Sequence, residues 1–412
     1  MEPKQILKEA EALSNKLTER RRCLHRRPEV GFDLAQTTSY VKSELCKIGC
    51  SPADCGKAGI TVSIGGKRPG KVFLLRADMD ALPIREESGE AFSSENENMH
   101  ACGHDMHTAM LLGAAELLKA HENEINGTVK LMFQPSEETL EGANDMIGAG
   151  VLENPKVDAA LMIHVISAMP LPAGTVVVCG GGVSAPGADF FSVKISGKGC
   201  HGSMPNKGVD PINAAAHIVT ALQTVHAREL SVSQDAVLTF GSIHGGNAPN
   251  IIPDSVELTG SLRTYDEEVR SFVKKRLTEI VRGIALTLRA EAEVSFDKEC
   301  PVLENDAELA HSTAVYVKEL LGSEKAFSQE ELSSPSGSKK SGNSLGSEDF
   351  SFVSRRVPSI MLSLAAGDPQ KGFVHPQHHP KVMFDESVLP AGSAVYSYTA
   401  MRWLEEHGEI MP

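Results

Sequence analysis

Short apolar runs alternate with amphipathic stretches along the first part of the chain. The apolar runs are bounded by glycine or proline and predict buried strands at 61–64, 72–75, 127–133 and 159–163. Between them, helical spacing of apolar residues predicts helices at 37–45 and 110–118, after a charged amphipathic helix over the first ~20 residues. Strands that alternate with helices indicate an α/β fold with a mainly parallel sheet covered on both faces.

This alternation changes after the glycine-rich run 179–184, which we interpret as a hinge. The following pattern predicts strand, helix, two strands, helix and strand, at 190–195, 211–224, 236–240, 255–262, 267–288 and 292–296. That order resembles a ferredoxin-like α+β sandwich. We therefore predict one domain made of residues 1–181 and 298–412, and a second domain, 182–297, inserted into it. Residues 333–347 are rich in Ser, Gly and Lys and predict a mobile surface loop.

Composition and charge narrow the class of protein. The chain has 412 residues, of which 41% are hydrophobic and 23% charged, as in ordinary globular proteins. A net charge of −14 disfavours nucleic acid as a partner. The amino-terminal segment lacks the features of a signal peptide, and no apolar run has membrane-spanning length, so we expect a cytoplasmic protein without a membrane partner. The 8 cysteines are irregularly spaced and are expected to be free thiols.

The densest chemistry lies at residues 99–107. This stretch holds one thiol, three imidazoles and one carboxylate, and it runs directly into an apolar helix. Thiolate, imidazole and carboxylate groups are the ligands of zinc-like divalent ions. The alternative interpretation is a chance cluster of histidines around a core cysteine.

Other metal-binding or acid–base groups follow predicted strands or lie in a rigid turn. In open α/β sheets, ligands bind beyond the carboxyl ends of the strands. Each of these groups also has a structural interpretation, as a turn cap, a solvated acidic loop, a core histidine or a surface turn. The groups are Asp78 and Asp80, Glu137 and Glu138, His164, and the turn 375–380.

Taken together, these positions point to two metal ions. Five ligands exceed what one closed tetrahedral zinc site needs, and they suit two ions that share ligands and keep open positions for water and substrate. The carboxylate next to a ligand, Glu137, can then face a water and act as general base. The five predicted ligands are Cys102, His104, Glu138, His164 and His378.

Six motifs in order make the chain recognisable: 76–83, 99–108, 134–138, 199–205, 346–350 and 378–380. As a set they resemble the amidohydrolase branch of the aminoacylase and carboxypeptidase-G-like metallopeptidases. Hippurate hydrolases, bacterial N-acyl-amino-acid deacylases and plant auxin-conjugate hydrolases belong to this branch. The resemblance runs from residue 24 to the carboxy-terminal helix, expected at 389–404.

The resemblance implies a catalytic, metal-binding domain with a smaller lid domain that often mediates homodimerisation. It implies two divalent ions (Mn, Zn or Co) on the five ligands, with Glu137 as general base. His378 is favoured over His379 because the family's ligand lies two residues before the proline. In the lid, His201 and Asn250 are expected to reach the scissile carbonyl or the substrate. Arg263 resembles an anchor for a carboxylate, which a bidentate guanidinium suits.

The resulting hypothesis is hydrolysis of an N-acyl amino acid, with an acetyl or aromatic acyl group, to a carboxylic acid and a free amino acid. Alternatives are a dipeptidase or N-acetyl-diaminopimelate deacetylase, a non-catalytic metal-dependent binding protein, and a redox-sensing thiol protein built on Cys102. Two departures from the family concern the substrate pocket. Residues 165–172 lack the bulky aromatic that relatives usually carry, and Gln377 stands where an aliphatic residue is common.

Overall fold

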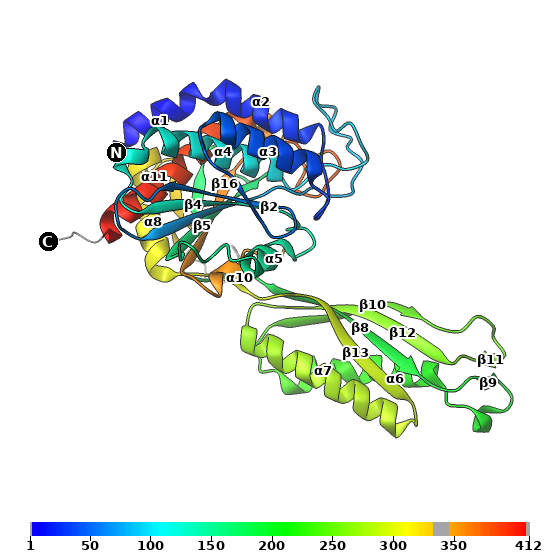
Figure 1. The fold of residues 1–412 in the computed structure, drawn as a ribbon. Coiled ribbons are helices and arrows are strands. Elements are labelled where there is room, and N and C mark those ends of the chain that lie inside the picture. The colour runs from blue at the N-terminus through cyan, green and yellow to red at the C-terminus, as the bar shows by residue number, and fades with distance from the viewer. Residues whose placement is uncertain (1, 333–345, 409–412) are drawn as a thin grey trace. The chain divides into compact units, whose positions relative to one another are not determined.

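The computed structural model describes residues 2–332 and 346–408, which form two compact units (Figure 1). The first unit contains residues 2–184, 304–332 and 349–408, and the second contains Ala185–Leu303 with residues 346–348. Each unit has its own hydrophobic core. Apart from its last two positions, the loop predicted at 333–347 lies outside the described residues.

An eight-stranded sheet with the strand order β1-β2-β4-β3-β5-β16-β6-β15 forms the centre of the first unit. Its central strands β4, β3, β5 and β16 are parallel, while β1, β2 and β6 run antiparallel to their inner neighbours. The predicted α/β class with a mainly parallel sheet is therefore confirmed. In sheet order, the strands are Ala53–Cys55, Gly59–Gly65, Thr128–Gln134, Val72–Asp78, Ala159–Ile166, Ser359–Ala365, Val176–Val178 and Ala326–Ser328.

Helices cover both faces of this sheet (Figure 1), which explains the apolar character of its central strands. Every residue of β3 is buried. The long helices α4 and α11 contact β3, and α1 and α2 pack against them, while the short helices α5 and α10 pack against each other. The helices are α1 Pro3–Ala12, α2 Ser14–His25, α3 Ala35–Lys47, α4 His104–Ala120, α5 Gly142–Gly148, α8 Ala307–Leu321, α9 Gln329–Leu332, α10 Ser351–Ser354 and α11 Leu389–His407.

The amino-terminal helix differs from the prediction because it is two helices. The first ends at Ala12, and the N–H of Leu13 donates to the carbonyl of Ala10 at 3.0 Å, three residues back rather than the α-helical four. The second ends at His25, shortly before Pro28, since a proline disfavours helix in the residue before it.

The second unit is a four-stranded antiparallel sheet with the order β10-β12-β8-β13 and two helices. This is the predicted ferredoxin-like arrangement. Residues of β13 alternate between exposed and partly buried, as expected for a sheet packed on one face. Asp210 and Asp266 cap the two helices by accepting backbone N–H bonds. The elements are β8 Gly187–Ser196, α6 Pro211–Thr224, β10 Ala236–His244, β12 Ser255–Thr264, α7 Glu267–Thr287 and β13 Glu291–Cys300.

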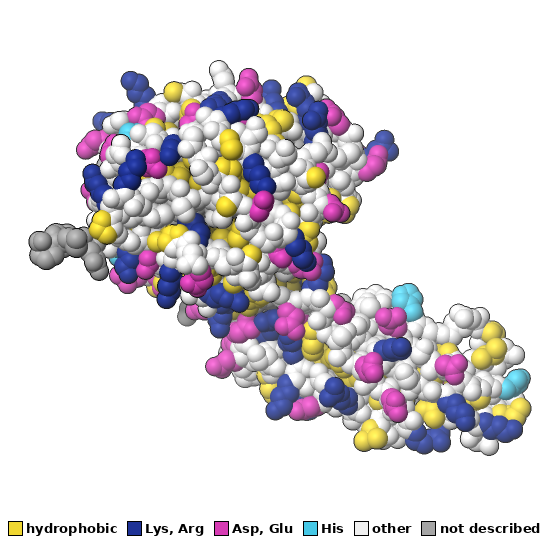
Figure 2. Space-filling model, viewed as in Figure 1, with side chains coloured by type: hydrophobic (Ala, Val, Ile, Leu, Met, Phe, Trp, Pro, Cys, Tyr) yellow, Lys and Arg dark blue, Asp and Glu magenta, His cyan; other side chains and the backbone are white. Residues whose placement is uncertain are grey.

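Two small two-stranded sheets complete the structure. Cys200–His201 (β9) pairs with Ile251–Ile252 (β11), and Gly182–Ala185 (β7) pairs with Leu303–Asn305 (β14). Because β13 continues to Cys300, the inserted unit extends past residue 297. In the described part of the chain, no helix has both the length and the apolar character needed to cross a membrane. Acidic and basic side chains are interspersed over the face shown in Figure 2.

Candidate metal centre

The first unit presents its candidate residues at the carboxyl ends of parallel strands and at the start of α4. Asp78 ends β3, Glu137 and Glu138 follow β4, and His164 lies near the end of β5. Parallel neighbours bring these ends to one edge of the sheet, so side chains far apart in sequence meet there.

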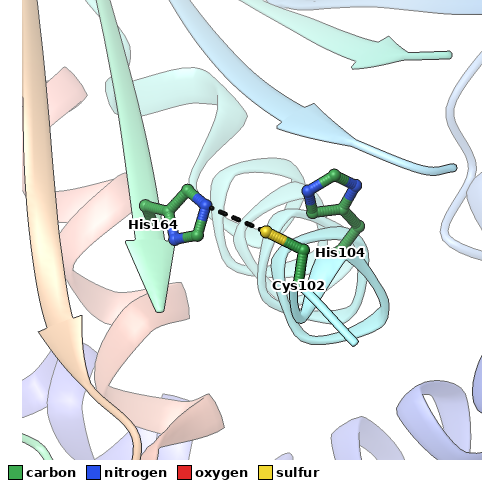
Figure 3. A group of neighbouring side chains, drawn as sticks. All are labelled: Cys102, His104 and His164. Atoms are coloured by element: carbon green, nitrogen blue, oxygen red, sulfur yellow. Dashed lines mark hydrogen bonds between the residues drawn. The ribbon is translucent and has the colours of Figure 1, made fainter. Parts of the chain in front are cut away.

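The turn into α4 places two candidate ligands on either side of Gly103. Gly103 has a left-handed backbone (φ 93°), and a Cβ at this position would lie 2.5 Å from Cγ2 of Val165. Only glycine readily adopts this backbone conformation and also has no Cβ that would clash with Val165. Figure 3 shows Cys102 between the imidazoles of His104 and His164, with Sγ of Cys102 3.5 Å from Nε2 of His164.

Backbone carbonyls orient both imidazoles. Nδ1 of His104 is 2.9 Å from the carbonyl oxygen of Asp80, and Nδ1 of His164 is 2.8 Å from that of Val165. A carbonyl oxygen only accepts, so Nδ1 carries the proton and donates in both residues. In the neutral form of each ring, Nε2 then has a lone pair available for a metal ion, the usual arrangement of histidine ligands.

The last two predicted ligands join the same cluster. Oε1 of Glu138 is 3.6 Å from Nε2 of His378 and 3.9 Å from Nε2 of His104. Ligand atoms of Cys102, His104 and His164 lie within 4.8 Å of one another, as do those of Cys102, Glu138 and His378. The structure therefore brings all five together as two groups that share the thiol.

Two buried atoms in this cluster fit a bound cation. Nε2 of His104 and Oε1 of Glu138 are buried and have no hydrogen-bond partner within the described residues. Leaving such groups unpaired costs about 1–3 kcal/mol each, so native structures rarely do so. A divalent ion would satisfy both, and the mixed thiol, imidazole and carboxylate donors fit zinc, manganese or cobalt.

The electrostatics of the cluster also fit a bound cation. Burial raises the pKa of the Cys102 thiol well above its usual range and, with Asp80 and Asp78 nearby, raises the pKa of Glu138 to about 7. Burial also lowers the pKa of His164 to about 3, which keeps its ring neutral. A bound cation would reverse the penalty on the thiolate and the carboxylate, which are the forms that coordinate metals.

Glu137 is held beside this cluster by its backbone. Its side chain is buried, with Oε2 3.9 Å from Nε2 of His104. The carboxylate of Asp80 accepts the backbone N–H groups of Glu137 and Glu138, at 3.0 and 3.2 Å. Asp80 therefore fixes the loop that carries both glutamates.

A buried chain of charged groups supports the cluster, and the sequence did not reveal it. His107 donates from Nδ1 to Asp78 at 2.6 Å, and its Nε2 accepts the backbone N–H of Val165 at 2.9 Å. Arg76 donates to Asp78 at 2.7 Å and to Asp349 at 2.9 Å. Asp78 had a sequence signal as a carboxylate at a strand end, whereas the link from Arg76 to Asp349 spans 273 positions and had none.

The turn 375–380 presents one of its histidines to the cluster. His378 approaches Glu138, whereas the ring of His379 stacks on His375 at 4.2 Å between centroids. Nδ1 of His379 also accepts the backbone N–H of Lys381. This geometry favours His378 over His379 as the ligand.

The remaining predicted site residues lie in the second unit. Nδ1 of His201 accepts the backbone N–H of Ser203 at 3.2 Å, so its proton is on Nε2 of an exposed ring. Asn250 is close by, because its carbonyl accepts the N–H of Gly202 at 2.7 Å. Arg263 lies apart from them on β12, where its guanidinium stacks over Phe190 at 5.6 Å. The substrate roles of all three remain predictions.

An α/β sheet whose strand ends gather a thiol, imidazoles and carboxylates, with one further buried glutamate, defines a metal-dependent hydrolase. The sequence model of the peptidase family M20/M25/M40 matches residues 74–402. The chain belongs to this family, and the resemblance seen in the motifs is confirmed.

Relatives and a solved structure agree with this assignment. N-acetyl-L-cysteine deacetylase from Bacillus subtilis is 35% identical over 94% of this chain and 88% of its own length. IAA-amino acid hydrolase ILR1-like 4 from Arabidopsis thaliana is 36% identical over 94% of this chain and 85% of its own length. A crystal structure from Bacillus subtilis, described as a dinuclear metal binding peptidase from the M20 family, superimposes with a TM-score of 0.77 and 31% identity, covering 96% of this chain and 99% of its own.

Proposed function

We propose that this protein is a metal-dependent amidohydrolase that cleaves an N-acyl amino acid to a carboxylic acid and a free amino acid. The observation that carries the proposal is the pair of buried, unsatisfied atoms, Nε2 of His104 and Oε1 of Glu138, beside a buried glutamate. The two relatives named above, an N-acetyl-L-cysteine deacetylase and an IAA-amino acid hydrolase, support the substrate class.

Two divalent ions, Mn, Zn or Co, would be held by the five candidate ligands. When bound, they would supply Lewis-acid polarisation of the amide and a more acidic water. We propose that the five ligands form two groups of three that share one thiol. The first group is Cys102, His104 and His164, and the second is Cys102, Glu138 and His378.

Glu137 is the proposed general base. Its carboxylate takes a proton from water as the water oxygen bonds to the amide carbon. It then delivers that proton to the amide nitrogen as the carbon–nitrogen bond breaks. Asp80 supports this role by fixing the backbone of Glu137.

The second unit is proposed to bind the substrate and act as a lid. The Nε2–H of His201 would donate to the developing oxyanion, with Asn250 beside it. Arg263 would pair with the substrate's carboxylate. We also propose that this unit mediates a homodimer and that the protein is cytoplasmic.

Rival functions differ in what they require. A dipeptidase or N-acetyl-diaminopimelate deacetylase would use the same centre on another substrate. A non-catalytic binding protein would not need the buried Glu137. A redox sensor would need a reactive thiolate, whereas burial raises the pKa of Cys102.

One experiment separates these functions. The protein is purified metal-free, restored with Mn²⁺, Zn²⁺ or Co²⁺ singly, and assayed on hippurate, N-acetyl amino acids including N-acetylcysteine, N-acetyl-diaminopimelate and dipeptides. We expect metal-dependent release of free amino acid from acyl amino acids. Activity confined to dipeptides or to N-acetyl-diaminopimelate would replace the proposed substrate, and ion binding without hydrolysis of any compound would favour a binding protein.

A further inference from the structure

Gln377 contacts the metal centre at a place where the family resemblance led us to expect an aliphatic residue. Its side-chain Nε2 donates to the carbonyl oxygen of Val165 at 2.8 Å. The same oxygen accepts the hydrogen bond from Nδ1 of His164 that orients that ring. A carbonyl oxygen has two lone pairs, so it can serve both donors.

The peptide of Val165 is held from its other side as well. Its N–H donates to Nε2 of His107 at 2.9 Å, and His107 is fixed in turn by Asp78. The Val165 carbonyl is therefore a rigid anchor within the centre rather than a free loop carbonyl.

The residue after Gln377 is a candidate ligand with an unusual backbone. His378 has a positive φ of 65°, a region that residues other than glycine occupy only where their surroundings hold them. Its N–H donates to the carbonyl of Ala101 at 3.0 Å, directly before Cys102. The carbonyl of Pro380 also accepts the N–H of Glu87 at 2.7 Å, and Gln377 attaches the turn to β5. The side chain of His378 is 54% exposed, so packing alone does not hold it.

We propose that Gln377 is a positioning residue of the metal centre, whose side-chain amide fastens the turn that carries His378 to the carbonyl that orients His164. The inference rests on the proposed metal centre. An aliphatic side chain cannot donate this bond, so this chain holds its exposed histidine ligand in a way that the usual residue would not. The ion bound by His378, Glu138 and Cys102 should depend on Gln377 more than the ion bound by the group that contains His164. The reason is that His164 keeps its own hydrogen bond to the carbonyl of Val165.

The test compares metal binding by metal-free full-length proteins, using titration calorimetry with Mn²⁺ or Zn²⁺ and metal analysis after dialysis. Gln377→Met removes the donor at nearly constant shape, and Gln377→Leu is the second variant should the first not fold. Gln370→Met is the matched control, because that glutamine has an exposed side chain in the same connecting segment. His378→Ala shows which of the two ions depends on the histidine.

We expect Gln377→Met to weaken one ion at least about tenfold, the same ion that His378→Ala loses, and to leave the other ion and the Gln370→Met control unchanged. Wild-type affinity for both ions in Gln377→Met or Gln377→Leu would overturn the inference while the metal centre stands. Equal weakening of both ions would also overturn it, since the role would then not be specific to His378. A wild-type protein that binds no ion would overturn the proposed function itself.

Discussion

The carboxylate of Asp80 accepts a hydrogen bond from the backbone N–H of Glu137 at 3.0 Å. This bond ties the end of β3 to the loop after β4, in which Ser136 and Leu140 have positive φ angles of 59° and 60°. Non-glycine residues in that region cost about 1–3 kcal/mol each, so the loop needs external support to keep its shape. Asp80 provides this support where the proposed base, Glu137, and the candidate ligand, Glu138, are neighbours in the chain.

Replacing Asp80 with Ala should therefore loosen both glutamates. We expect kcat to fall at least tenfold and metal affinity to fall by about 10–100-fold, as for other groups that orient ligands. Steady-state kinetics at saturating metal, with a parallel metal titration, would measure both. If kcat and metal affinity both stayed at their wild-type values, the loop would hold its geometry without this carboxylate.

Glu137→Gln should separate chemistry from metal binding. The amide cannot accept the proton from water, so we expect kcat to fall by about 10²–10⁴-fold, while metal content stays near wild type because Glu137 is not among the proposed ligands. Elemental analysis of the variant is the control. Retained turnover would assign the base to another group.

Cys102→Ser should weaken metal binding, because a hydroxyl is a poorer ligand than a thiolate. Since both ligand groups include this thiol, both ions should be affected. Cys46→Ser is the matched control, because Cys46 is exposed and lies on α3. Unchanged stoichiometry and affinity in Cys102→Ser would remove the thiol from the ligand set.

His201→Ala should slow hydrolysis without removing metal. If its Nε2–H stabilises the oxyanion, the loss of one such donor lowers kcat by about 10²–10³-fold. His217→Ala, an exposed histidine on α6 of the same unit, controls for surface effects. Equal rates in the two variants would leave the second unit without a chemical role.

The pair of His25 and Glu86 should make stability depend on pH. Burial alone would raise the pKa of Glu86, but hydrogen bonds from His25, Ser88 and Ser94 lower it to about 2. Its contribution is complete above about pH 4.5 and is lost as the pH falls towards 2. Burial and Arg21 oppose the charge of His25, yet Asp105 and Glu86 outweigh them and raise its pKa. The contribution of His25 is thus complete below about pH 6.5 and is lost as the pH rises through the folded value.

Glu86→Gln should therefore lower the free energy of unfolding by about 1–3 kcal/mol near pH 5.5, and by progressively less as the pH approaches 2. Urea unfolding at several pH values measures this, with Glu87→Gln as an exposed neighbouring control. A destabilisation that is constant over this range would show that charge is not the cause.

The sequence predicted the parts of the fold that rest on local pattern. Strands such as β3 and β5 are continuous apolar runs, and the order of elements in the second unit follows from alternation and turn residues. It did not predict β6 and β15, each of three residues, because strands so short gain their stability from their neighbours in the sheet. The break at Leu13 likewise carries no local signal.

The same division holds for the site. Ligand types stood out because thiol, imidazole and carboxylate groups are concentrated at predicted strand ends. Asp80, His107 and Gln377 were noticed in the sequence, but their roles in positioning the ligands were not, since they act through backbone atoms or through partners distant in sequence. Such contacts depend on how the strands align in the folded sheet, and this alignment cannot be predicted from a single sequence.

The buried thiol of Cys102 has a consequence for how the enzyme fills with metal. Burial raises the pKa of this thiol well above its usual range, so the thiol is protonated at neutral pH when no metal is bound. Coordination by Cys102, as proposed, would therefore release a proton to solvent, so protons would compete with the metal for this sulfur. We therefore expect the affinity for metal to rise with pH and to fall in acid, even when the metal concentration is constant.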